Sequence, residues 1–406
     1  MPYLDLNLDL TDEQMDLKNA VHKFSKEVLR PASLELDQIA DPDEMINSKL
    51  YKDTLKKGYE LGYHTIFIPD YYGGLGLEPL EVHLVLEELG WGSPDFAIAF
   101  GVACFPAFFA SMVPTDFLEE HVISPFCANS DASIIGCWAI TEPNHGTDTL
   151  CPGTAGFANP HIRGQVAARK EGNEYVISGQ KSAWVSNGTV ATHALAYLNI
   201  DPSMGMAGGG ICVVPLDLPG VSKGKPLNKM GQRALNQGEI FFDEVRVPEE
   251  YMLVDQESYE SMLDLTLATA NAGMGAIFTG AARACFEMAL AYSKERVQGG
   301  KVLFEHQMIK HKLFSMFMKI EAARAYSRAA WIYNANTTPP ATHYSIASKV
   351  FCTQAAFEVA NDAVQIFGGY GVSKEYPIEK YFRDIRAALI EDGANDSLMI
   401  TGAHAL

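Results

Sequence analysis

Apolar residues recur at helical spacing through the first third of the chain. Val21, Phe24 and Val28 fall three or four residues apart, and the stretch before them opens with Thr11-Asp-Glu-Gln, which is typical of a helix N-terminus. A glycine-rich break is followed by a second apolar-rich segment that begins at Pro79. The pattern predicts that helices dominate this third of the chain.

The middle third has a different pattern, because short runs rich in β-branched and aromatic residues alternate with turn residues. These runs predict a small β domain. Long helical patterns then return and continue to a Gly-Gly-Tyr-Gly break before a last pair of helices. The expected strands cover residues 133–141, 175–178, 179–188, 194–199, 210–215 and 239–247, and the expected long helices cover residues 259–295, 307–334 and 344–366.

This order of elements predicts an α+β fold in a chain of 406 residues, which is long enough for three domains. We expect an N-terminal α-helical domain over residues 1–130, a middle β domain over residues 131–248 and a C-terminal α-helical domain over residues 249–406.

Composition and charge exclude several classes of protein. The chain carries 31 basic and 50 acidic residues, a net charge of −19, so the phosphate backbone of a nucleic acid would on average be repelled. Seven scattered cysteines without CxxC spacing indicate neither a disulfide framework nor a metal site. Residues 1–14 contain no basic residue and no continuous apolar block, so we expect no export signal and a cytoplasmic location.

Two long stretches without charged residues, 96–114 and 265–282, have the length of a membrane span. Pro106 interrupts the first stretch, and Asn271 and several threonines lie in the second. Both stretches are therefore predicted to be buried helices of a bundle, and no membrane span is expected.

Two polar segments of the middle third could hold a ligand. Residues 139–148 follow a predicted strand and present hydroxyls, backbone amides and Gly146, where a planar group could approach the backbone closely. The second segment carries Trp184 and Ser186 on one strand, a combination that suits a stacked heteroaromatic ring. Either pattern alone is common in ordinary turns and strands.

Together and in this order, the two segments resemble the acyl-CoA dehydrogenase family, and the resemblance extends over nearly the whole chain. Three further segments carry the resemblance. They are Lys229-Met-Gly-Gln-Arg233 with Phe242-Asp-Glu-Val-Arg-Val-Pro248, Arg296 through Glu305-His-Gln307, and Gln365-Ile-Phe-Gly-Gly-Tyr-Gly371 followed by Lys374-Glu-Tyr-Pro-Ile-Glu-Lys380 and Arg383-Asp384.

The resemblance implies a β-barrel-like middle domain, a C-terminal four-helix bundle and FAD bound between them. It also implies a homotetramer, an acyl-CoA substrate and an electron-transferring flavoprotein or similar acceptor. The positions that match FAD contacts are Trp138, Ile140, Thr141, Gly146, Thr147, Trp184, Ser186 and Asn395 for the cofactor of the same subunit, and Arg296, Gln307, Gln365, Gly368 and Gly369 for that of a neighbouring subunit. The positions that match substrate contacts are Thr147, Ala97, Gly101, Asp264, Thr266 and Gly393.

The family's reaction needs a carboxylate that removes a proton next to a thioester while hydride leaves the adjacent carbon for flavin N5. In the family pattern an aromatic residue precedes the catalytic Glu, and Gly follows it. Counting from Asp384 to Gly393 without a gap places Glu391 in the aromatic position and Asp392 in the catalytic position. Aspartate is shorter by about 1.5 Å, one carbon–carbon bond. We therefore expect Asp392 to be the base, with Glu391 as the alternative if the alignment shifts by one residue.

The shorter acid changes the expected substrate. The shorter carboxylate must take the substrate's proton at a different depth in the acyl pocket. The small residues Ala97 and Gly101 would leave lateral space in this pocket, so a branched or cyclic acyl-CoA is expected. If neither acid of the pair is the base, Asp95 is the next candidate. An extra residue between Lys181 and Trp184 is expected to shift the flavin strand.

Three alternatives on the same scaffold stay open. Aspartate in the base position also occurs in nitroalkane oxidases, and flavin monooxygenases of this scaffold dispense with the carboxylate. Thr147 favours the thioester substrate, whereas Leu267, where the family commonly has Arg, counts against it. The third alternative is a catalytically inert scaffold protein.

Overall fold

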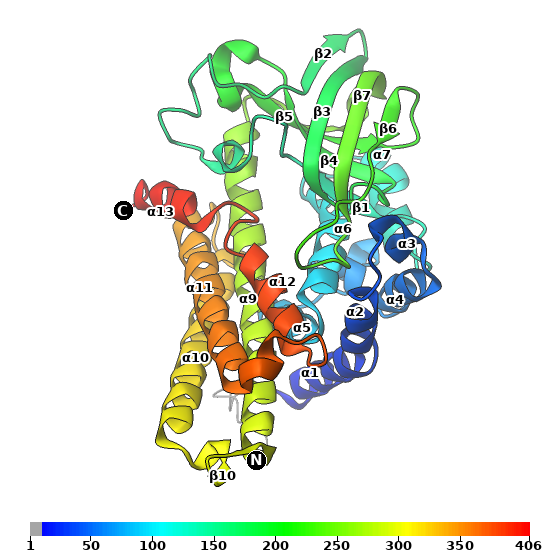
Figure 1. Ribbon diagram of the computed structural model, residues 1–406. Helices are drawn as coiled ribbons and strands as arrows, with labels where there is room; N and C mark the ends of the chain where they lie inside the picture. Colours follow the sequence, from blue (N-terminus) through cyan, green and yellow to red (C-terminus); the bar gives the residue numbers. More distant parts are fainter. Residues whose placement is uncertain (1–9) are drawn as a thin grey trace.

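The computed structural model describes residues 10–406, and it begins with a layer of helices. The expectation of no export signal concerns residues 1–14, of which residues 1–9 lie outside the described residues. The predicted capping box is present, because Thr11 Oγ1 accepts the Gln14 amide at 3.2 Å and Gln14 Oε1 accepts the Thr11 amide. The helices of this layer are α1 Asp12–Phe24, α2 Arg30–Leu36, α3 Pro42–Asn47, α4 Lys49–Glu60, α5 Pro79–Gly92, α6 Pro94–Met112, α7 Asp116–Leu118 and α8 Ser124–Cys127 (Figure 1).

An eight-stranded sheet follows, in the order β6-β7-β3-β1-β4-β5-β8 with β2 paired to β3 and β4. Its neighbours are antiparallel except that β4 runs parallel to β1 and β2. The sheet lies at one end of the molecule, above the helices in Figure 1. Its strands are β1 Gly136–Ala139, β2 Ala167–Glu171, β3 Glu174–Ser186, β4 His193–Asn199, β5 Gly209–Pro215, β6 Val221–Lys223, β7 Gln237–Pro248 and β8 Met252–Val254.

The runs 175–178 and 179–188 are not two strands, because one strand, β3, contains the first run and residues 179–186 of the second. Gly179 has φ +135°, and the register of β3 against β7 shifts between Ile177 and Gly179. The extra residue of this bulge lies on β7, where two residues oppose Ser178, and β3 continues through Gly179. This explains why the sequence pattern breaks there.

The C-terminal helices are α9 Tyr259–Glu295, α10 Gln307–Ala335, α11 Thr342–Phe367, α12 Ile378–Ala387 and α13 Asn395–Ala403. The long helix α9 packs against α5, α10 and α11, so its apolar surface is covered within the chain. Glycines allow this close packing: a Cβ at Gly280 would lie 1.9 Å from the Glu87 carbonyl oxygen, and one at Gly90 would lie 2.1 Å from that of Ile277.

Among the described residues, one helix, α6, is long and apolar enough to cross a membrane by length and composition. Its most apolar window is 83% buried against the rest of the chain, and Pro106 lies inside it. These features are typical of the core helix of a folded domain.

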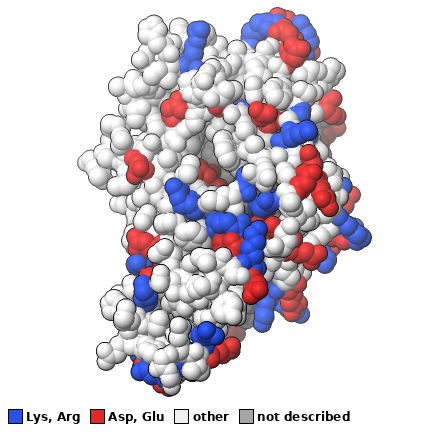
Figure 2. All heavy atoms as spheres, viewed as in Figure 1, with Lys and Arg blue, Asp and Glu red and all other residues white. Residues whose placement is uncertain are grey.

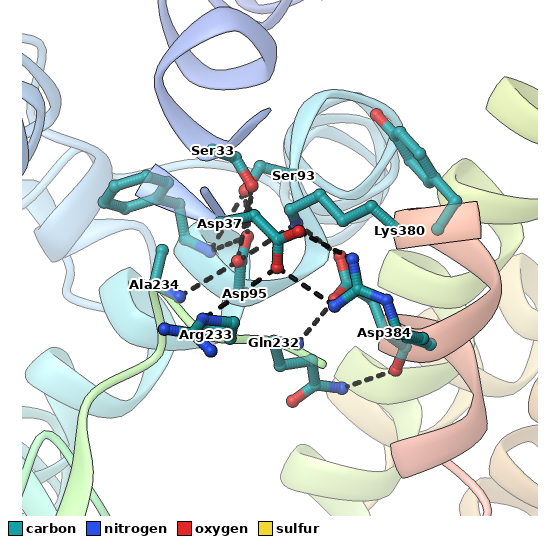
Figure 3. Close-up of polar contacts among 12 residues, drawn as sticks. Ser33, Asp37, Ser93, Asp95, Gln232, Arg233, Ala234, Lys380 and Asp384 are labelled. Carbon is teal, nitrogen blue, oxygen red and sulfur yellow. Dashed lines mark hydrogen bonds and ion pairs between the residues drawn. The ribbon is translucent and has the colours of Figure 1, made fainter. Parts of the chain in front are cut away.

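A buried polar cluster joins all three parts of the chain (Figure 3). Asp95, at the start of α6, accepts hydrogen bonds from Ser33 Oγ at 3.1 Å and from the Ala234 amide at 3.2 Å, and Lys380 Nζ of α12 lies 3.3 Å away. Lys380 also pairs with Asp384 at 2.5 Å. Burial alone would raise the pKa of Asp95, but Lys380 and the hydrogen bonds from Ser93 and the Ala234 amide hold it below its usual value. Asp95 is enclosed by partners, so its role is structural and the alternative of a base at this position is wrong.

We expect Asp95→Ala to destabilise the protein by about 3–5 kcal/mol, because it leaves Lys380 without one of its two carboxylates inside the core. Urea unfolding followed by circular dichroism measures the change. Lys49→Ala is the matched control, because it breaks the Lys49–Asp53 pair, which lies on the surface, and it should change stability by no more than about 1 kcal/mol. Equal effects of the two variants would contradict the prediction.

Candidate active site

The two acids of interest, Glu391 and Asp392, lie in the turn between α12 and α13. Asp392 has φ +52° and Gly393 has φ +95°, so two successive residues adopt the left-handed conformation. This conformation is uncommon for residues other than glycine and is tolerated best by Asn and Asp. The Asn395 amide closes the turn with a 3.0 Å hydrogen bond to the Leu389 carbonyl. We call residues 391–394 the acid turn.

Two side chains from other elements hold the acid turn. Lys349 Nζ, buried in α11, donates to the Gly393 carbonyl and to Asn395 Oδ1, both at 2.7 Å. Thr147 Oγ1 accepts the Ala394 amide at 3.0 Å, so the loop after β1 reaches the turn from the opposite side. The turn is therefore fixed between the β domain and α11.

A third contact fixes Glu391. Gln232 Nε2 donates to Glu391 Oε1 at 2.5 Å and to the Asp384 carbonyl at 3.0 Å. Gln232 itself is left-handed, with φ +49°, and its backbone amide donates to Asp384. Through Asp384, the acid turn is attached to the buried cluster of Figure 3.

The Asp392 carboxylate has no hydrogen-bond donor among the described residues. Burial raises its pKa to about 6, although Lys349 opposes the shift. Burial and the charge of Asp392 raise the pKa of Glu391 to about 7, against the opposing effects of Gln232, Lys229 and Lys349. A carboxylate that lacks a partner and has a raised pKa is suited to accept a proton.

The predicted flavin strand faces the same site. Trp184 is 58% exposed on β3, although large aromatic side chains are usually buried. Gln237 Nε2 donates to Ser186 Oγ at 3.1 Å, and Lys229 Nζ donates to Gln237 Oε1 at 2.8 Å. Because Lys229 also acts electrostatically on Glu391, these contacts lead from the strand to the acid turn.

The β1 side of this site is more buried. Trp138 pairs with Ser186 across β1 and β3, and Trp138 and Ile140 are both buried. Thr141 is half-buried and its carbonyl accepts the Ser182 amide at 2.8 Å. Gly146 has no atom within 4 Å of an added Cβ, so a ligand has room there. The surface in this view is hollowed between the β domain and the helices, and charged side chains of both signs gather below the hollow (Figure 2).

The extra residue on the flavin strand produces a bulge. Lys181 pairs with Ile240 and Val185 pairs with Gly238, so five residues of β3 (181–185) oppose three residues of β7 (238–240). Trp184 lies within this bulge, which twists the strand locally and turns the indole outward.

The second group of predicted FAD residues lies elsewhere. Arg296 directly follows α9, and its guanidinium lies 5.8 Å from the ring of Tyr370 in the glycine-rich turn. All residues of this second group are exposed: Arg296, Gln307, Gln365, Gly368 and Gly369. Because α9 has 37 residues, its two ends are about 55 Å apart, and Tyr259 at its first end packs against Tyr197 of the sheet. One chain therefore does not bring the two groups together.

The predicted substrate residues are only partly brought to the acid turn. Ala97 is fully buried on α6 between Asp95, which binds the Ala234 amide, and Ala99, whose carbonyl accepts Asn187 Nδ2 at 2.9 Å. Because Asp95 and Ala99 share one face of α6 and Ala97 lies two residues from each, Ala97 is on the opposite face of the helix. Gly101 lies one turn further along and has only Phe67 near an added Cβ, at 3.8 Å.

Two of the predicted contact residues, Thr266 and Asn395, are already hydrogen-bonded within the protein. The Thr266 hydroxyl bonds to Tyr197 Oη at 2.8 Å and to the Met262 carbonyl, and it is fully buried. Both amide atoms of Asn395 are bonded, to Lys349 and Thr353, so this side chain supports the acid turn. Asp264 is half-buried near the start of α9, where burial raises its pKa.

Sequence reasoning missed Lys349 and Gln232. A lysine inside an apolar helical stretch is a detectable signal, because lysine is rarely buried without a partner. The role of Gln232 depends on a left-handed backbone and on contacts more than 150 residues away in sequence, and no local pattern reports these.

Comparison with known proteins identifies the family. Its profiles match at residues 11–111 (acyl-CoA dehydrogenase, N-terminal domain), 137–245 (middle domain) and 263–406 (C-terminal domain). The chain belongs to the acyl-CoA dehydrogenase family. It is therefore an oxidoreductase that acts on acyl-CoA, and the family and α+β fold predicted from the sequence are confirmed.

Two relatives and one solved structure show how far this acyl-CoA dehydrogenase family member resembles others. It is 31% identical to a probable acyl-CoA dehydrogenase of Bacillus subtilis, over 96% of this chain and 97% of that protein. It is 31% identical to the benzylmalonyl-CoA dehydrogenase of Aromatoleum aromaticum, over 97% and 98%. The structure of butyryl-CoA dehydrogenase from Megasphaera elsdenii superposes with a TM-score of 0.86 at 30% identity, over 98% and 99%.

The raised pKa of Asp392 makes a prediction about stability. An acid whose pKa is raised by folding stabilises the protein below its unfolded pKa, and this contribution is lost as the pH rises through about 6. Asp392→Asn removes the ionised form and keeps a residue that tolerates the left-handed backbone. We expect this variant to be more stable than the wild type at pH 8, by on the order of 1 kcal/mol per pKa unit, with a smaller difference at pH 5.

Thermal unfolding at the two pH values tests this prediction. Asp396→Asn is the control, because Asp396 is exposed in the first turn of α13, where its charge is favourable. It should give no gain at either pH. A loss of stability in Asp392→Asn that is greater at pH 8 than at pH 5 would show that the ionised carboxylate is stabilised by folding.

Proposed function

We propose that the protein is an FAD-dependent acyl-CoA dehydrogenase that uses Asp392 as its base and prefers a branched or cyclic acyl group. The observation that carries the proposal is the Asp392 carboxylate, which lacks a protein partner and has a pKa raised to about 6. It stands on a turn held by Lys349, Thr147 and, through Glu391, by Gln232.

The residues present fit FAD. The exposed indole of Trp184, the Ser186 hydroxyl and the open backbone at Gly146 suit the flavin end. At the other end of α9, the exposed Arg296 guanidinium suits a diphosphate, and Gly368 and Gly369 have no atom near an added Cβ. When bound, FAD would supply the acceptor for the hydride that leaves the acyl group.

The chain's own residues supply the proton transfer and the orientation. Asp392 Oδ would take the proton from the carbon next to the thioester carbonyl, and Lys349 keeps the carboxylate ionised near neutral pH. Thr147 couples the loop expected to meet the CoA arm to the acid turn, so binding there would set the depth of the acyl group.

The acyl preference rests on reach and space. Asp392 reaches about 1.5 Å less far than a glutamate would, so the reacting carbon must come closer to the turn. We expect the width for a ring or a branch to come from the small residues Ala97 and Gly101 on α6, where a Cβ added at Gly101 would meet only Phe67, at 3.8 Å. A bulky skeleton that fills this width would hold its proton against the shorter acid.

The electron acceptor is proposed to be an electron-transferring flavoprotein or a similar carrier, and the assembly a homotetramer. The homotetramer is proposed because the two groups of predicted FAD-binding residues lie at opposite ends of α9. Another copy of the chain is then required to complete each site.

Leu267 favours a second candidate, an oxidase of carbon acids such as nitroalkanes. It is a fully buried leucine where the family commonly has arginine, so it offers no charge to a thioester. Turnover of nitroethane with release of nitrite, and none of acyl-CoA, would support this candidate.

Asp392→Asn should lower turnover of the preferred acyl-CoA by about 10²–10⁴-fold, because the amide cannot accept the proton. FAD should remain bound, as its absorbance will show. Glu391→Gln should cost less than Asp392→Asn. If Asp392→Asn keeps wild-type turnover and Glu391→Gln abolishes it, Glu391 is the base.

Arg296→Ala should weaken FAD retention by on the order of 1.5–3 kcal/mol, through loss of a charge-assisted hydrogen bond to phosphate. The proposal that Arg296 acts on a neighbouring subunit has a sharper test. When Arg296→Ala and Asp392→Asn chains are co-expressed with different tags and purified together, one type of site combines an intact Asp392 with an intact Arg296. We expect partial recovery of activity relative to either variant alone. No recovery in the mixed assembly would place Arg296 in its own subunit's site.

A further inference from the structure

Glu391 has an acceptor oxygen without a partner. Its Oε1 accepts the 2.5 Å hydrogen bond from Gln232 Nε2, and no described residue donates to Oε2. The residue is partly exposed, so protein atoms do not seal this carboxyl group. It stands beside Asp392 in the position where the family pattern has an aromatic residue, next to the expected reacting carbons.

The neighbouring cations do not satisfy this oxygen. Lys229 Nζ donates to the Leu235 carbonyl at 2.6 Å and to Gln237 Oε1 at 2.8 Å. Lys349 Nζ donates to the Gly393 carbonyl and to Asn395 Oδ1. Both ammonium groups influence Glu391 through their charge and are hydrogen-bonded to other acceptors. None of the hydrogen bonds of these two ammonium groups goes to Oε2, so water or a bound ligand supplies its donor.

The chemistry of the acyl group decides whether this arrangement is favourable. A purely hydrocarbon group against Glu391 would remove water from the free oxygen and supply nothing in return, which penalises binding. A hydroxyl or ammonium group would replace the lost water with a direct hydrogen bond, and a site built to pair with such a group discriminates strongly against the analogue that lacks it.

We propose that Glu391 is a specificity-determining residue, and that the natural acyl group carries a hydrogen-bond donor, a hydroxyl or an ammonium, on a carbon close to the reacting pair. This inference rests on the proposed function and narrows it: the branch or ring carries a polar donor that meets Glu391 Oε2. Gln232 holds the other oxygen and so fixes the direction in which Oε2 points.

The test uses the FAD-loaded enzyme and three acyl-CoA probes of similar size: cyclohexanecarbonyl-CoA, a ring-hydroxylated cyclohexanecarbonyl-CoA and piperidinecarbonyl-CoA. The measured quantity is kcat/KM with an artificial electron acceptor. We expect one donor-bearing probe to exceed cyclohexanecarbonyl-CoA by about 10–100-fold in the wild type. The hydroxylated and the piperidine probes distinguish the neutral donor from the cationic donor.

Two substitutions of Glu391 separate recognition from structure. Glu391→Gln keeps the side-chain volume, and the oxygen of the new amide can still accept the hydrogen bond from Gln232. The amide nitrogen, which is a donor, then points toward the acyl group. We expect the preference for the donor-bearing probe to disappear. Glu391→Leu removes both functions, and it should favour cyclohexanecarbonyl-CoA. Glu375→Gln is the matched control, because it makes the same change at an exposed position and should keep the wild-type ratio.

Three results would overturn the inference. Turnover of all three probes with no preference for a donor, or a ratio that Glu391→Leu leaves unchanged, would refute the role of Glu391 while acyl-CoA oxidation itself stands. Equal loss of activity toward all probes in Glu391→Gln would show that Glu391 is the base. Failure of the wild type to oxidise any acyl-CoA would instead contradict the proposed function.

Discussion

The geometry of the candidate site depends on one buried ammonium group, that of Lys380. It lies between Asp95 of α6 and Asp384 of α12, and Asp384 binds the backbone amide of Gln232 in the loop before β7. Three domains thus meet on a single ion network. A hydrophobic contact of equal area would tolerate sliding, whereas two carboxylates around one ammonium fix both distance and direction. Gln232 transmits this constraint directly to Glu391.

The acid turn differs from the ion network that supports it in its hydrogen bonding and in the direction of its pKa shifts. Asp95 has donors on every side and a lowered pKa, whereas Asp392 has no donor, a left-handed backbone and a raised pKa. A strained backbone and a carboxylate without a hydrogen-bond donor persist only where the surrounding structure imposes them. Lys349 and Thr147 impose them here by binding the backbone of the turn and its supporting side chain Asn395, so neither of them occupies the carboxylate of Asp392 or Oε2 of Glu391.

Elements with a strong periodic pattern were predictable from the sequence, and those defined by long-range contacts were not. The pattern at residues 259–295 matches α9, because a long apolar helix carries its own signal. Strands β2, β6 and β8 were missed. Strand β2 is mostly exposed and charged, and β6 and β8 have only three residues each, so their pairing depends on neighbours in the sheet and not on side-chain alternation.

The site divides in the same way. Asp392 was chosen by counting from Asp384 to Gly393 against the pattern of the family, and its role as the base stays a prediction. The sequence could not show that Asn395 faces Lys349, that Thr266 is bonded to Tyr197, or that Asp95 is enclosed. Each of these contacts joins segments far apart in the chain, and the choice between a structural and a chemical role for a polar side chain depends on them.

The length of α9 connects the core of the subunit to its assembly. The same helix packs its first turns against the sheet and presents Arg296 about 55 Å away at its other end. No bending of a helix that is covered by α5, α10 and α11 could bring Arg296 back to the flavin strand. Under the proposed function, a chain with FAD-binding residues at both ends of α9 would contribute half of each of two sites. Two copies arranged about a two-fold axis can place the Arg296 end of each helix against the β domain of the other. On this argument the rigid packing that stabilises the subunit is also what makes a single subunit incomplete for binding FAD.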